Sequence, residues 1–410
     1  MKWIGHSNIL NGFHVFNGYY MRNKKDDIDV NNLVTLSAII VISSVVPIVL
    51  LAAPALVAIF ISTLGLTPQH SGYLISSEMA GMGLATLPAL FWVKAINWQR
   101  IALIALIVAA LGQLVTVAVD SFGWLLAVRF ITGLATGTLM SVCLVSINLS
   151  VNPDRVFGLW VVGQLSFGSL VIAVLPSVVD SFGVAGFYVP LAAIFLLLIF
   201  LVNHLPTHTP STLEKYNVEH SSESTTFIHV CMGVVGVFVF YSGLSGAWTY
   251  IERVGNGAGL DISVINNALV VSSLAGIVGA LSASVLSTKW GRLVPASLGF
   301  VLMVASLILL TDTIFFVAVT PVVFLLTASL FKFTWTFTLP YLLSSISDND
   351  ATGRSVVVVN FGIGCGLAAG PAISAMVLTG NDYADIMWIS ALFMVICLLL
   401  FLPLLFQKST

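Results

Sequence analysis

The chain has 410 residues, of which 58% are hydrophobic and 8% are charged, whereas about 25% of the residues in a soluble domain are charged. So few charged residues cannot cover a water-soluble fold of this length, and the apolar segments are continuous and not alternating, which excludes both a soluble protein and a transmembrane β-barrel. The formal net charge of −2 gives no sign of a nucleic-acid partner.

The chain begins with a polar segment over 1–32, which lacks the pattern of a signal peptide and contains two possible initiating residues, Met1 and Met21. The first apolar span covers about 33–64 and contains Pro47 and Pro54, which membrane helices tolerate and which leave carbonyl groups unpaired. A helix needs about 20 apolar residues to cross a bilayer. Eleven further spans follow, at about 71–93, 101–119, 124–150, 156–178, 183–203, 227–250, 264–287, 293–311, 317–345, 354–378 and 386–406, which makes twelve in all.

The longest polar interruption, 204–226, divides the spans into two sets of six. We therefore expect an N-terminal six-helix bundle over 33–203 and a C-terminal one over 227–406, with the segment 1–32, the linker 204–226 and the tail 407–410 in the cytoplasm. This orientation places twelve of the 15 lysines and arginines on the cytoplasmic side. Arg253 then falls outside, and Arg129 and Lys332 lie within spans. The positive-inside rule favours this topology, with both termini cytoplasmic.

The two halves share a sequence pattern. SSEMAGMG at 76–83 corresponds to SSLAGIVG at 272–279, and a basic turn follows each of them, at 93–100 and 287–292. Arg129 in the fourth span has Lys332 at a comparable place in the tenth. Parallel six-helix repeats joined by a polar loop are the layout in which two bundles rock about a site at the membrane midplane.

Three motifs carry a resemblance to a known family: an arginine at 129 with glycines four and eight residues later, STKWGR at 287–292, and GCGLAAGP at 364–371. On these residues the chain resembles the major facilitator superfamily, and in particular its small prokaryotic drug and metabolite:proton permeases. The resemblance implies an all-α polytopic membrane protein with twelve transmembrane helices in two six-helix bundles. GCGLAAGP is similar to a glycine-rich motif that drug:proton antiporters carry in their fifth span, and this likeness favours antiport. Here it lies in the eleventh span, while the fifth span has Pro176 without a preceding glycine, and Thr288 replaces the aspartate expected in the loop motif.

Charged side chains inside a membrane are costly, so each is a candidate functional residue. Glu78 lies in the second span and Arg129 in the fourth, and these spans pack together in the fold that the chain resembles. We expect Glu78 to accept a proton and Arg129 to tune it; the alternative is a purely structural ion pair. Gly133 and Gly137 follow Arg129 at helical spacing, which predicts that another helix approaches closely there.

The tenth span carries a lysine among aromatic residues, in FKFTWTFTLPYLL at 331–343. We expect a cavity wall that offers a cation and aromatic faces to a substrate; the alternative is a lysine that snorkels to the interface beside lipid-facing rings. Trp248 and Tyr250 line either the same cavity or an interfacial aromatic belt, and polar residues inside spans either contact substrate or join helices by hydrogen bonds. The substrate-cavity candidates are Lys332, Trp335, Phe331, Tyr341, Trp248, Tyr250, Gln164 and Asn360.

Charged residues near the span ends are candidates for gates. Two of them lie at the outer mouth and four on the cytoplasmic side, namely Glu252, Arg253, Lys289, Arg292, Asp350 and Arg354. We expect no catalytic residue, no metal and no cofactor, because the spans carry no cluster of nucleophile and base, no metal-ligand spacing and no paired cysteines.

The sequence therefore favours a secondary transporter of a small organic solute, meaning an organic anion, a zwitterion or a drug-like aromatic. We expect proton-coupled efflux by a monomer in the lipid bilayer of a bacterial inner membrane. A uniporter or an importer of a small metabolite is the alternative within transport. From another class, a non-transporting sensor or scaffold on the same fold predicts a large soluble domain or a long cytoplasmic tail.

Overall fold

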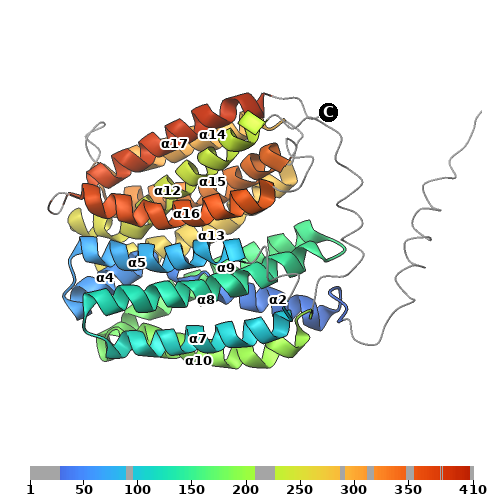
Figure 1. The fold of residues 1–410 in the computed structure, drawn as a ribbon. Coiled ribbons are helices and arrows are strands. Elements are labelled where there is room, and N and C mark those ends of the chain that lie inside the picture. The colour runs from blue at the N-terminus through green and yellow to red at the C-terminus, as the bar shows by residue number, and fades with distance from the viewer. Residues whose placement is uncertain are drawn as a thin grey trace, which may run out of the picture.

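The computed structural model describes residues 28–88, 96–207, 227–286, 291–311, 318–347, 355–378, 380 and 382–406. Almost all of this part of the chain is helical (Figure 1). The helices are α2 (Leu33–Val45), α3 (Ile48–Leu51), α4 (Ala53–Leu64), α5 (Pro68–Leu84), α7 (Trp98–Ala118), α8 (Phe122–Asn148), α9 (Pro153–Phe182), α10 (Ala185–Leu198), the 3₁₀ helix η1 (Ile199–His204), α12 (Phe227–Gly257), α13 (Ile262–Leu286), α14 (Leu293–Leu309), α15 (Pro321–Ser347), α16 (Ser355–Val377) and α17 (Ala384–Leu405).

These helices account for the twelve expected spans. Among the described residues, 9 helical segments are long and apolar enough to cross a membrane by themselves. The other three spans are α5, the shorter apolar helix α14, and the first span, which consists of α2, α3 and α4. The prediction of an all-α polytopic membrane protein is therefore confirmed.

The first span is broken at its two prolines. Proline has no N–H, so Pro47 and Pro54 each leave the carbonyl four residues earlier without its helical donor. The carbonyl opposite Pro47 belongs to Ser43, and the indole Nε1 of Trp160 in α9 donates to it at 2.9 Å. This contact shows how an irregular helix is tolerated inside a membrane, since a neighbouring helix supplies the missing donor.

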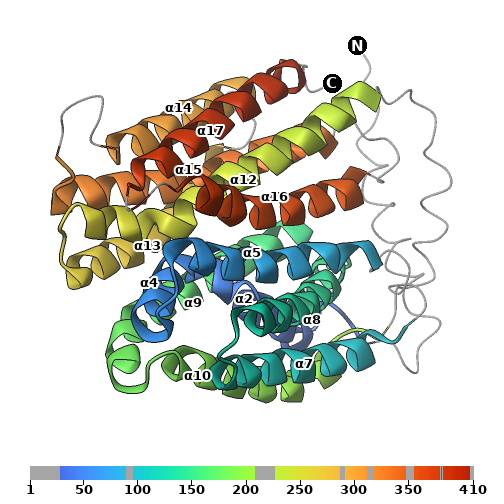
Figure 2. The same cartoon turned by 60° about the vertical axis from the view of Figure 1, so that its left-hand side comes forward.

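The helices form two groups, one from α2 to η1 and one from α12 to α17, which lie against each other along α5 and α16 (Figures 1 and 2). Further contacts between the groups join α9 to α13 and α4 to α12. Side chains bridge the α5–α16 interface, because the Ser76 hydroxyl donates to the carbonyl of Ala368 at 2.6 Å and the Gln69 amide donates to that of Leu378 at 3.3 Å.

Two glycines let α5 and α16 touch at their backbones. A Cβ atom on Gly364 would lie 2.3 Å from the Cα of Gly83, and a Cβ on Gly83 would lie 2.7 Å from the Cα of Gly364. Neither backbone can yield without moving its helix. The smallest side chain at either position therefore forces the two groups apart here.

We expect Gly364→Ala to lower the melting temperature of the purified protein, because a misplaced methyl group at a packed interface costs about 1–3 kcal/mol. The matched control is Gly158→Ala in α9, where a Cβ would meet nothing within 4 Å. Alanine favours a helix over glycine by about 1 kcal/mol, so the control should be neutral or stabilising. A Gly364→Ala protein that melts with the control would contradict the predicted clash.

Candidate functional site

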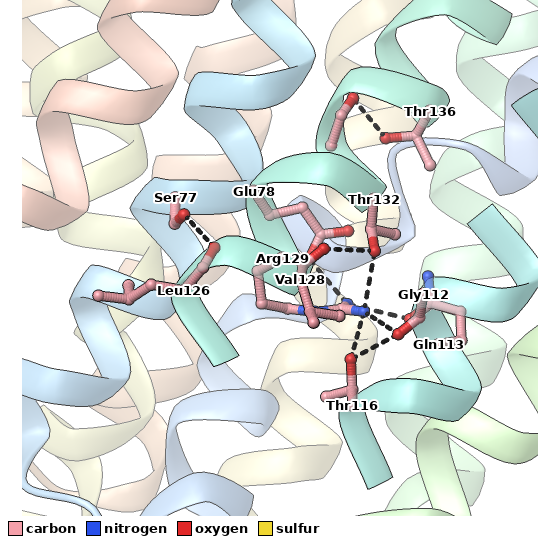
Figure 3. A network of polar contacts seen from close by, with 11 residues as sticks. Ser77, Glu78, Gly112, Gln113, Thr116, Leu126, Val128, Arg129, Thr132 and Thr136 are labelled. Carbon is pink, nitrogen blue, oxygen red and sulfur yellow. Dashed lines mark hydrogen bonds and ion pairs between the residues drawn. The ribbon is translucent and has the colours of Figure 1, made fainter. Parts of the chain in front are cut away.

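Arg129 lies at the centre of a buried polar network between α5, α7, α8 and α10 (Figure 3). Its side chain is 1% exposed, and its Nη1 lies 3.1 Å from the Oε2 of Glu78, whose side chain is 3% exposed. The same nitrogen donates to the Oε1 of Gln113 at 3.0 Å. The ring of Tyr188 lies 4.7 Å from the guanidinium carbon, as a cation–π partner.

The second terminal nitrogen of Arg129 is equally well satisfied. Its Nη2 donates to the Gly112 carbonyl at 3.0 Å, to the Thr116 hydroxyl at 2.6 Å and to the Thr132 hydroxyl at 3.3 Å. The network has a strong asymmetry. Arg129 contacts four oxygen acceptors besides Glu78, whereas the only hydrogen bond that the described residues give to the Glu78 carboxylate comes from Arg129.

Glycines bring three of these helices, α5, α7 and α8, close together. A Cβ on Gly133 would lie 2.0 Å from the carbonyl oxygen of Glu78, and one on Gly112 would lie 2.0 Å from the Oγ1 of Thr132. One turn further along α8, a Cβ on Gly137 would lie 2.3 Å from the carbonyl oxygen of Met82. The close helix approach that the small residues after Arg129 predicted is therefore present, and α5 is the helix that makes it.

The sequence patterns did not predict Gln113, Thr116, Thr132 or Tyr188 as members of this network. A signal for the first two exists, because an amide and a hydroxyl three residues apart lie on one face of an otherwise apolar span. Tyr188 gives no comparable signal in the sequence, since its ring is ordinary for a membrane helix and only the packing of α10 brings it over Arg129.

Lys332 is buried on α15, with its ammonium between two tryptophan rings. Its Nζ lies 3.7 Å from the ring centroid of Trp248 in α12 and 3.8 Å from that of Trp335 in α15. The residue is 1% exposed, and its Nζ has no hydrogen-bond acceptor in the part of the chain that the structure describes. The snorkelling alternative is therefore wrong, because the ammonium does not reach the surface of the protein.

The surroundings of Lys332 include both groups of helices. A Cβ on Gly276 of α13 would lie 3.1 Å from the Cγ of Lys332 and 3.3 Å from the Cδ1 of Leu165 of α9. Trp248, in turn, donates its indole N–H to the carbonyls of Leu50 and Leu51 in the broken first span. The lysine thus lies where α12, α13 and α15 meet the N-terminal group. Arg129 belongs to a separate network inside that group.

The other cavity candidates do not all lie near Lys332. Phe331 lies near Trp335, with ring centroids 6.4 Å apart, and is fully buried. Tyr341 lies further along α15, with its hydroxyl 3.5 Å from the carbonyl of Ala283. Gln164 is half-buried beside Leu165 in α9, and Asn360 is half-buried in the second turn of α16. Of the residues proposed from the tenth span, only Phe331 and Trp335 therefore join the surroundings of Lys332.

Trp248 and Tyr250 do not belong to an aromatic belt, because both are fully buried inside the protein. The Tyr250 hydroxyl donates to the carbonyl of Pro68 at 3.0 Å, which adds a contact between α12 and the start of α5. Two residues further along α12, Glu252 is buried and forms a two-pronged ion pair with Arg253, including a 2.7 Å bond from Nη2 to Oε1. The Glu252 carboxylate is thus shielded from solvent.

The cytoplasmic gate candidates lie largely beyond the structural description. Lys289, Asp350 and Arg354 are outside the described residues. Arg292 is the half-buried residue that precedes α14, whose first helical residue is Leu293.

Comparison with known proteins gives one family and several similar folds. A family model described as Major Facilitator Superfamily matches residues 34–352. No curated protein matches the sequence. A solved structure of a D-xylose-proton symporter has a TM-score of 0.69 at 13% identity and covers 90% of this chain and 95% of its own. A solved structure of the nucleoside transporter NupG has a TM-score of 0.63 at 14% identity and covers 91% of this chain and 100% of its own.

Proposed function

This chain belongs to the major facilitator superfamily and is a secondary transporter, and from that premise we propose that it carries a small organic solute with an acidic group past Lys332. The two groups of helices would act as six-helix bundles, joined by the linker 204–226, that rock about this site in alternating access. The similarity to the D-xylose-proton symporter and to NupG supports the fold on which this proposal rests. At 13% and 14% identity it does not indicate the substrate.

The observation that carries the proposal is the unpaired ammonium of Lys332. A buried charge without a counter-ion is costly unless a partner satisfies it. No acceptor lies within hydrogen-bond reach of Nζ among the described residues, and the two rings beside it offer only cation–π contacts. A carboxylate or a similar anionic group would complete the site, and Phe331 and Trp335 would contact an apolar or aromatic body.

An uptake assay tests the proposal. Purified protein in liposomes should exchange a radiolabelled aromatic monocarboxylate such as benzoate, and benzoate should raise its melting temperature. The matched neutral amide, benzamide, should do neither. Exchange of neutral sugars or nucleosides without any exchange of organic anions would contradict the proposed substrate class and leave the family assignment intact.

We propose that transport is coupled to protons through Glu78. Protonation of Glu78 would remove the negative charge beside Arg129 and leave the guanidinium its four other oxygen acceptors, so the network has room for a neutral Glu78. A charged Glu78, by contrast, depends on Arg129 alone among its described contacts. The arrangement suits a proton site, because Glu78 can change its charge while Arg129 stays positively charged and keeps its other contacts.

Glu78→Gln fixes the neutral form of this side chain and tests the coupling. We expect solute exchange without a pH gradient to persist, because Lys332 belongs to a different network. We expect accumulation driven by an imposed pH gradient to be abolished, because a glutamine amide cannot take up and release the proton that would drive the solute. Full gradient-driven accumulation by the variant would overturn the role of Glu78 and require another proton site. Equal transport by the wild type with and without a pH gradient would favour a uniporter.

Direction and setting are part of the same proposal. We propose export, with both termini and the linker on the cytoplasmic side of a bacterial inner membrane and with a monomer as the working unit. The glycine-rich GCGLAAGP stretch, whose helix α16 packs on α5, supports the antiport reading through its likeness to antiporter motifs. Inside-out and right-side-out vesicles, loaded separately and given opposite pH gradients, distinguish export from import.

A further inference from the structure

We propose that Trp248 is a latch between the two halves of the transporter and that anion binding at Lys332 loosens it. The proposal rests on the proposed function for its ligand, but its first half concerns the empty protein and can be tested without one. Trp248 joins the two parts of the proposal, because its ring contacts Lys332 and its N–H donates to carbonyls of the first span.

Pro54 makes the acceptor of this latch. The proline removes the N–H that would bond the carbonyl of Leu50 in a continuous helix. The indole Nε1 of Trp248 donates to this carbonyl at 3.0 Å and to the neighbouring carbonyl of Leu51 at 3.2 Å. Trp248 is fully buried and comes from α12, so the bond crosses between the halves in a place without water competition.

The same indole ring meets the ammonium of Lys332. Its face lies 3.7 Å from Nζ, while its edge donates to the Leu50 carbonyl. A cation over the face of an indole draws electron density from the ring, and polarised donors make stronger hydrogen bonds. The lysine therefore strengthens the N–H donor as long as its charge is directed at the ring. An anion that pairs with the ammonium draws that charge away and weakens the contact with the first span.

The chain contains a matched control for this geometry. Pro47 frees the carbonyl of Ser43 in the same way, and the indole of Trp160 caps it at 2.9 Å. Trp160 and Ser43, however, belong to the same half, on α9 and α2. The two contacts share their chemistry, and only that of Trp248 ties the halves together.

The state of the latch can be measured as a distance between spin labels on α9 and α13, one in each half. Ser169 of α9 donates to the carbonyl of Val270 of α13, and Leu165 lies by Gly276, so these helices are antiparallel and the end of α9 lies near the start of α13. Phe182 and Ile262 are exposed at these ends, at 68% and 50%. Labels at these two positions, in a background without the cysteines Cys143, Cys231, Cys365 and Cys397, give the distance distribution between the halves.

We expect Trp248→Phe, which keeps a ring for Lys332 and removes the N–H, to raise the ratio of separated to closed molecules about two- to tenfold, the size that one hydrogen bond supports. Pro54→Ala, which returns an N–H to the Leu50 carbonyl, should shift the distribution in the same direction. Trp160→Phe should leave it unchanged. An unchanged distribution in both Trp248→Phe and Pro54→Ala overturns the latch, whatever the transport assays show.

Benzoate is the probe for the coupling. It should shift the wild-type distribution towards that of Trp248→Phe and should have no effect on Lys332→Met. If Trp248→Phe separates the halves and benzoate leaves the wild-type distribution unchanged while it binds, the latch is supported and its control by the anion is overturned. Absence of benzoate binding in a melting assay counts against the proposed substrate class alone.

Discussion

Replacing Lys332 by methionine is expected to weaken the binding of organic anions and to stabilise the empty transporter at the same time. Methionine keeps a long unbranched side chain between Trp248 and Trp335 and lacks the charge. A hydrogen bond to a charged group contributes about 1.5–3 kcal/mol, so the affinity for benzoate should fall about 10- to 100-fold. The buried unsatisfied ammonium disappears, and with it a cost of about 1–3 kcal/mol.

The two effects have opposite signs, which makes the test specific. Damage to the fold would lower both the melting temperature and the affinity for benzoate. Loss of the Lys332 charge alone raises the melting temperature and lowers the affinity. Calorimetric titration with benzoate and benzamide, together with melting curves, measures both quantities. A Lys332→Met protein that keeps the benzoate affinity of the wild type would exclude Lys332 as the anion site.

Replacing Arg129 by methionine is expected to cause a large loss of stability. The substitution leaves the Glu78 carboxylate buried without its partner, and removal of one member of a buried ion pair costs about 3–5 kcal/mol. It also removes the donors that satisfy Gly112, Gln113, Thr116 and Thr132. Unfolding curves in detergent should show a transition well below that of the wild type.

A double-mutant cycle separates the ion pair from the rest of this network. Glu78→Gln alone should cost much less than Arg129→Met, because Arg129 keeps four acceptors. The pair of changes together should cost less than the sum of the two, by about 0.5–3 kcal/mol, as contacting residues do. Additive costs would show that Glu78 and Arg129 do not interact, contrary to the 3.1 Å contact.

The sequence predicted the fold well because membrane helices leave a direct trace in it. Each span is a continuous apolar run, and the bounds of α7, α8 and α13 differ from the expected ones by three residues at most. The first span differs more, since one span with two prolines became three helices. The prolines were visible in the sequence, but whether a proline bends or breaks a helix depends on neighbours such as Trp160 that supply the missing donors.

The candidate sites were only partly predictable. Glu78 and Arg129 are the charged residues of the second and fourth spans, which were expected to pack together. Their contact was predictable because both residues lie at a similar depth in the membrane. The contact of Lys332 with Trp248 joins residues from α15 and α12, and nothing local to either helix fixes their rotation towards each other. Long-range orientation of this kind comes from packing, as with the glycine at 276 that admits the lysine stem.

Because the first span is interrupted, its two ends pack against different groups of helices. Its beginning, α2, packs on α8 and α9 of its own half, whereas its end, α4, packs on α12 of the other half as well as on α5. A continuous rod would transmit any tilt of one end to the other. With α3 as an articulation, the end of the span can follow the opposite half while its beginning stays with its own. In the proposed rocking of the two bundles, this joint would let α4 stay packed on α12 while α2 stays packed on α8 and α9.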